Sequence, residues 1–118
     1  MVFVYTSYES MINRNFICII GGAGHVGAPL GLALSSKGYN VTLIDKNQKN
    51  IKKINNGIMP FVEVGCEKLL KKMIYKKKIF ATNQLDKVKK CKYIIVCIGT
   101  PINNRFEPNL KKFFDFFY

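Results

Sequence analysis

One segment decides the fold: Phe16-Ile17-Cys18-Ile19-Ile20-Gly21-Gly22-Ala23-Gly24-His25-Val26-Gly27. Its first five residues are apolar and mostly β-branched, which predicts a strand buried on both faces. The glycines that follow predict a tight turn, and the Leu- and Ala-rich residues 28–37 predict a helix. A strand, a glycine turn and a helix in this order are typical of the opening of a dinucleotide-binding unit.

Three glycines of the turn are expected to have separate roles. Gly22 permits the tight turn, Gly24 lets the backbone come close to a pyrophosphate, and Gly27 lets the helix lie against the strand. We expect free N–H groups between residues 21 and 27 to face the anion, together with the positive end of the helix dipole.

An acidic residue strengthens this interpretation. Residues 41–44 predict a second strand, and Asp45 follows Gly27 by 18 residues, close to the ~20 expected for a ribose-binding carboxylate. Such a carboxylate accepts hydrogen bonds from ribose hydroxyls and repels a 2′-phosphate, which favours NAD over NADP. The alternative is a purely structural glycine turn with an acid on the surface.

The rest of the chain alternates between strand and helix patterns. Strands are predicted over residues 15–20, 40–45, 79–82 and 93–98, and helices over 24–37, 47–56, 63–77, 84–90 and 110–118. This alternation predicts an α/β fold: a Rossmann-type doubly wound parallel sheet, truncated after the fourth strand and its following helix. We expect the strand order third, second, first, fourth, with an N-terminal extension over residues 1–14 and an incomplete NAD-binding domain over 15–118.

Composition narrows the possible functions. The 118 residues fit one domain and contain no apolar run long enough to span a bilayer, so we expect no membrane partner. The net charge is +12, but 17 of the 19 basic residues are lysines spread along the chain, which favours solvated helix faces over a nucleic-acid site.

The cysteines and the single histidine predict no metal site. Cys18 and Cys97 fall in predicted buried strands, whereas Cys66 and Cys91 are placed near helix surfaces, and the spacing of the four matches no zinc pattern. We therefore expect reduced thiols and a cytoplasmic protein.

Several motifs together resemble one enzyme family. They are Gly21 to Leu30, Ile44-Asp45-Lys46-Asn47, Ile54 to Phe61, Glu63, Gly65 and Ile98-Gly99-Thr100-Pro101. Over residues 15–117 the chain is similar to the N-terminal domain of the UDP-glucose/GDP-mannose dehydrogenase family, with the nearer likeness to its UDP-N-acetyl-mannosamine dehydrogenase branch.

The resemblance implies a cofactor, a reaction and residue roles. It implies NAD-dependent oxidation of the C6 alcohol of a UDP-sugar to a carboxylate, for polysaccharide precursor synthesis, by a homo-oligomeric enzyme. It places His25 and Val26 at the pyrophosphate turn, Asp45 on the adenosine ribose, and Thr100 near the reactive end of the cofactor. The family's catalytic cysteine lies beyond residue 118, so we expect no catalytic residue here and no dehydrogenase activity from these residues alone.

Two other functions stay open at this point. The spacing of Gly21, Gly24 and Gly27 also fits extended short-chain dehydrogenases and sugar epimerases, although no Tyr here is followed four residues later by the Lys that they need. The second is a non-enzymatic basic module that binds nucleic acid.

Overall fold

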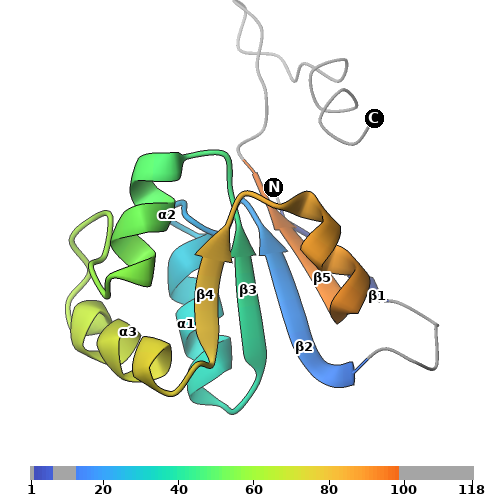
Figure 1. Cartoon of the computed structure of the whole chain (residues 1–118), viewed down its shortest axis with the longest axis horizontal. Coiled ribbons are helices and arrows are strands. Elements are labelled where there is room, and N and C mark those ends of the chain that lie inside the picture. The colour runs from blue at the N-terminus through green and yellow to red at the C-terminus, as the bar shows by residue number, and fades with distance from the viewer. Residues whose placement is uncertain (1, 7–12, 99–118) are drawn as a thin grey trace, which may run out of the picture.

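A five-stranded sheet lies at the centre of the protein (Figure 1). The computed structural model describes residues 2–6 and 13–98. The strands are β1 (Val2–Thr6), β2 (Asn13–Ile20), β3 (Asn40–Ile44), β4 (Ile79–Thr82) and β5 (Cys91–Cys97). Their order is β1-β5-β2-β3-β4, and β2 pairs in parallel with both β3 and β5. The predicted α/β class and the order of the four predicted strands are confirmed.

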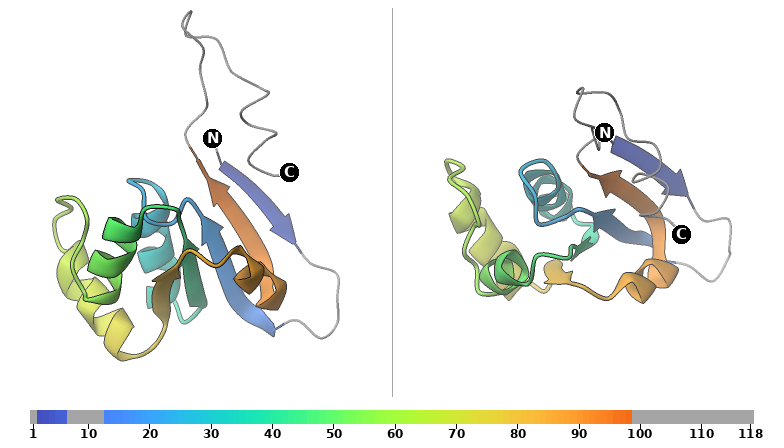
Figure 2. Two further views of the ribbon diagram at one scale, coloured as in Figure 1. Left: turned by 45° about the horizontal axis from the view of Figure 1, so that its top comes forward. Right: turned by 90° about the horizontal axis from the view of Figure 1, so that it is seen from above.

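The fifth strand, β1, corrects the expectation of a loose extension over residues 1–14. Val2–Thr6 pairs with β5 in the antiparallel direction, with Val2 opposite Cys97 and Thr6 opposite Tyr93. This strand forms one edge of the sheet (Figure 2). Because β1 runs against β5, its first residues lie beside the carboxyl end of β5.

Helices cover the two faces of the sheet unequally. They are α1 (Gly27–Ser36), α2 (Gln48–Asn55) and α3 (Cys66–Tyr75), with a 3₁₀ helix, η1, at Leu85–Lys90. Side chains of α1, α2 and α3 pack in one core with Ile17, Ile19 and Leu43. Val88 of η1 packs on the other face, against a core that includes Cys18 and Ile20. Alternate residues of β2 therefore supply both cores, as expected of a central strand.

Two boundaries differ from the prediction for clear reasons. Helix α1 begins at Gly27 rather than Gly24, because residues 24–26 belong to the turn. Strand β5 begins at Cys91 rather than Tyr93, and Cys91 is buried in the core beside Cys18 instead of lying near a helix surface. The lysine-rich η1 ends directly before β5, so no clear change in the sequence pattern marks where the strand begins.

Some predictions fall outside the described residues. The loop Gly99-Thr100-Pro101 and the helix predicted over residues 110–118 are among them. In the part of the chain that is described, no helix has the length and apolar character needed to cross a membrane. The same residues contain no group of three or more His, Cys, Asp or Glu that could hold a metal ion.

Candidate functional site

The glycine turn connects β2 to α1 and packs very closely. Gly21 has a positive φ of 79°, so the left-handed backbone conformation belongs to Gly21 and not to Gly22. A Cβ added to Gly22 would lie 2.7 Å from the Cβ of Leu43, and one added to Gly27 would overlap the carbonyl oxygen of Gly21. Gly22 therefore lets the turn pack against β3. Gly27 lets α1 pack against the turn, rather than against the strand as predicted.

Gly24 differs from its neighbours in having open space around it. A Cβ added there would meet only the carbonyl oxygen of Gly21 within 4 Å, at 3.4 Å. Packing within the described part of the protein therefore does not require position 24 to be a glycine. A bare backbone that faces open space is what close approach of an anion needs.

The N–H groups of the turn fall into two sets, which corrects the expectation that all of them are free. Four are occupied: those of Gly21 and Gly22 by the carbonyl oxygen of Ile44 (2.8 and 3.0 Å), that of Ala23 by Oδ2 of Asp45 (3.0 Å), and that of Gly24 by the carbonyl oxygen of Gly21 (3.3 Å). The first three bonds hold the turn against the end of β3, and the fourth lies within the turn.

The remaining N–H groups, those of His25, Val26 and Gly27, donate to no acceptor among the described residues. They stand at the start of α1, where Val26 provides no side-chain cap and the first turn contains no acidic residue. Among the described residues, neither the cap nor the first turn of α1 therefore neutralises the positive end of the helix dipole. This set of donors can bind an anion.

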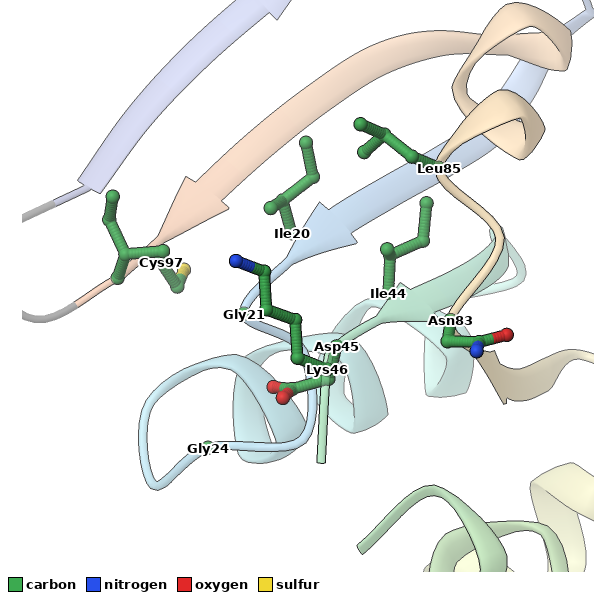
Figure 3. A pocket seen from close by; sticks show the side chains of 10 residues that line it. Ile20, Gly21, Gly24, Ile44, Asp45, Lys46, Asn83, Leu85 and Cys97 are labelled. Atoms are coloured by element: carbon green, nitrogen blue, oxygen red, sulfur yellow. The ribbon is translucent and has the colours of Figure 1, made fainter. Parts of the chain in front are cut away.

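Asp45 lies beside the turn, as predicted, and is held there by two hydrogen bonds (Figure 3). Its Oδ2 accepts from the N–H of Ala23 and its Oδ1 accepts from the N–H of Asn47, each at 3.0 Å. Each carboxylate oxygen has a further lone pair, so both can still accept a hydroxyl proton. The side chain is half-buried, and its carboxylate is oriented before any ligand binds.

Two adjoining hollows lie above the carboxyl ends of the strands. The first has a volume of about 340 Å³ and is lined by Asp45, Lys46, Asn83 and Leu85, among others. The second has a volume of about 230 Å³ and is lined by Val2, His25, Val26 and Gly27. Both are also lined by Gly21, Gly24, Cys97 and Ile98. The glycine turn thus lies between a hollow that contains the acid and a hollow that contains the free donors.

Three side chains support the turn in ways that sequence reasoning missed. The imidazole of His25 stacks on Phe61, with ring centroids 4.2 Å apart, and so joins the turn to the segment between α2 and α3. Asn50 donates from Nδ2 to the carbonyl oxygen of Ala23 at 3.2 Å. The side chain of Lys46 extends across Gly21 in Figure 3 and adds positive charge to the first hollow. Of these three side chains, only Lys46 could have been expected at the site from the local sequence, since it follows Asp45 directly.

The cysteine at the site is not suited to nucleophilic chemistry. Cys97 lines both hollows, and burial raises the pKa of its thiol, which keeps it protonated at neutral pH. The neighbouring Cys91 thiol and burial raise the pKa of Cys18 as well. Thr100, the remaining predicted site residue, lies outside the described residues.

Comparison with known proteins identifies similar sequences. The model of the UDP-glucose/GDP-mannose dehydrogenase family, NAD binding domain, matches residues 15–116. The UDP-N-acetyl-D-mannosamine dehydrogenase of Pyrococcus horikoshii is 30% identical over 89 residues, which are 75% of this chain and 21% of the relative. GDP-mannose 6-dehydrogenase of Pseudomonas savastanoi pv. phaseolicola is 37% identical over 83 residues, which are 70% of this chain and 19% of the relative. The chain thus spans about one fifth of the length of these relatives.

Solved structures of two such proteins superimpose on the chain. A ternary complex of GDP-mannose dehydrogenase from Pseudomonas aeruginosa gives a TM-score of 0.73 at 30% identity, covering 82% of this chain and 22% of that one. The UDP-N-acetylmannosamine dehydrogenase from Pyrococcus horikoshii gives 0.72 at 26% identity, covering 83% and 23%.

Proposed function

We propose that this chain, which belongs to the UDP-glucose/GDP-mannose dehydrogenase family through its NAD binding domain, is the cofactor-binding portion of an enzyme that oxidises the C6 alcohol of a UDP-sugar to a carboxylate. NAD, the cofactor of this domain, would accept the two hydrides that this four-electron oxidation releases, one for each of two NAD⁺ molecules, with water supplying the second oxygen of the carboxylate. The residues described here would bind and orient the cofactor.

One observation carries the proposal: three unoccupied N–H groups and the carboxylate of Asp45, which two hydrogen bonds hold in place, lie on either side of Gly24, a glycine with open space around it. The donors of His25, Val26 and Gly27 suit a pyrophosphate, because they combine hydrogen bonds with the positive end of a helix. Asp45 would accept hydrogen bonds from the adenosine ribose. Gly22 keeps the turn close to β3, and Gly24 leaves room for the phosphates. Thr100 would contact the cofactor near its reactive end.

The substrate is proposed from the family resemblance. Relatives include a dehydrogenase named for UDP-N-acetyl-D-mannosamine, which supports a UDP-sugar. The role in polysaccharide precursor synthesis rests on the family resemblance alone. We place the whole enzyme in the cytoplasm, because all four cysteines are free thiols, and we expect it to be a homo-oligomer. We further propose that these 118 residues alone bind NAD and do not oxidise a sugar, so incubation with NAD⁺ and UDP-sugars should form no NADH.

Calorimetric titration with NAD⁺ tests the cofactor site. Replacing Asp45 with Asn removes the charge but keeps an oxygen that can accept from the N–H of Ala23, so the fold should persist. Loss of the charged hydrogen bonds to ribose should weaken NAD⁺ binding by about 1.5–3 kcal/mol, or roughly tenfold to more than a hundredfold.

Asp86→Asn provides the matched control. Asp86 is an exposed acid on η1 that lines neither hollow, so its loss changes the net charge equally and should leave NAD⁺ affinity unchanged. Equal affinities of the Asp45→Asn variant and the wild type would contradict the assigned role of Asp45.

A further inference from the structure

Strand β1 contributes to the candidate site, although the family model begins only at residue 15. Because β1 is antiparallel to β5, Val2 pairs with Cys97 at the carboxyl end of β5, next to the glycine turn. Val2 lines the second hollow together with His25, Val26 and Gly27. A residue outside the family match therefore lies beside the free N–H donors.

The positions of the two hollows indicate which half of a dinucleotide would meet Val2. Asp45 lies in the first hollow, which would therefore hold the adenosine end. The pyrophosphate would lie where the two hollows share Gly21 and Gly24, against the N–H donors of residues 25–27 at the near side of the second hollow. The other half of the dinucleotide would then extend into the second hollow, on the side of β5 and β1.

The wall of the second hollow on this side is apolar. Val2, Cys97 and Ile98 lie together there, and Val2 is 52% exposed, so a ligand can cover it. Covering apolar surface stabilises a bound ring without a directional contact. Resting on the proposed function, we propose that Val2 of β1 forms an apolar wall for the nicotinamide half of NAD.

Comparison of NAD⁺ with ADP tests this role, because ADP carries the adenosine and both phosphates but no nicotinamide. In Val2→Asn, NAD⁺ affinity measured by calorimetry should fall about fivefold, as expected for partial loss of apolar contact, while ADP affinity stays unchanged. The matched control is Val4→Asn: Val4 shares the strand and the face, is 61% exposed, and does not line the hollow.

The possible outcomes separate the two proposals. NAD⁺ affinity that is unchanged in Val2→Asn overturns the role of Val2 alone. Equal losses of NAD⁺ affinity in Val2→Asn and Val4→Asn also overturn it, because they would reflect a weakened strand. If the wild type binds neither NAD⁺ nor ADP, the proposed function itself is wrong. A loss confined to NAD⁺ and to Val2→Asn supports the inference.

Discussion

At the scale of single residues, the glycines of the turn separate folding from binding. Close packing against β3 requires position 22 to have no side chain, whereas a side chain added at position 24 would face open space. The same substitution, Gly to Ala, should therefore have different effects at two positions that are two residues apart. This contrast distinguishes a cofactor site from a glycine turn that serves only to connect a strand to a helix.

Gly22→Ala should destabilise the fold by about 1–3 kcal/mol, because its Cβ would lie 2.7 Å from the Cβ and 2.8 Å from the Cα of Leu43.

Gly24→Ala should leave the urea midpoint of unfolding unchanged but weaken NAD⁺ binding about tenfold or more, because the methyl group takes the space of the pyrophosphate. Unchanged NAD⁺ affinity in a folded Gly24→Ala variant would count against the site.

Sequence reasoning located the acid and the turn but not the state of each donor. Asp45 lies where the spacing predicted, because consecutive parallel strands bring their carboxyl ends to one edge of the sheet. The carbonyl oxygen of Ile44 accepts hydrogen bonds from two amides of the turn. These bonds depend on how β3 packs against the turn, which no local sequence pattern specifies. The stacking of His25 on Phe61 joins residues far apart in the chain and was equally inaccessible.

At the scale of secondary-structure elements, Asn55 joins α2 to the edge strand β4. Its Nδ2 donates to the carbonyl oxygen of Ala81 and its Oδ1 accepts from the N–H of Ala81, both at 2.8 Å. The side-chain amide thus pairs with β4 as the backbone of a further strand would. This contact satisfies edge groups of β4 and fixes the strand whose end carries Asn83 at the first hollow.

Asn55→Ala should lower the free energy of unfolding by about 1–3 kcal/mol, because two partly buried backbone groups of Ala81 lose their partners. Urea denaturation measures this difference. In the neighbouring variant Asn56→Ala, only one exposed hydrogen bond, to the carbonyl oxygen of Lys52, is lost, and the change should stay within about 0.5 kcal/mol. Similar losses in both variants would contradict the contribution of the Asn55 contact.

The elements that alternate regularly were predictable, and β1 was not. Residues 16–20 of β2 are continuously apolar, and α2 has apolar residues at helical spacing, so local patterns identify both. The partner of β1 is β5, at the other end of the described chain, and its pairing depends on the assembled sheet. The sequence of β1 is apolar and aromatic, as in many strands, but four of its five residues remain exposed at the edge of the sheet.

At the scale of the whole molecule, weak anion binding by the net positive charge has to be distinguished from specific binding at the glycine turn. The net charge of +12 attracts any anion weakly, and the exposed lysines of α2 and α3 line neither hollow. A dinucleotide held by such surfaces would bind without a defined position and would be released by salt. Binding at the turn predicts instead one saturable site that includes particular backbone amides.

An NMR titration of the ¹⁵N-labelled chain with NAD⁺ at physiological salt tests this central claim most directly. The account predicts saturable shifts that are largest at the amides of His25, Val26 and Gly27, because their free N–H groups would gain a charged partner. Shifts spread over the lysines of α2 and α3, or no saturable shift at residues 25–27, would contradict it.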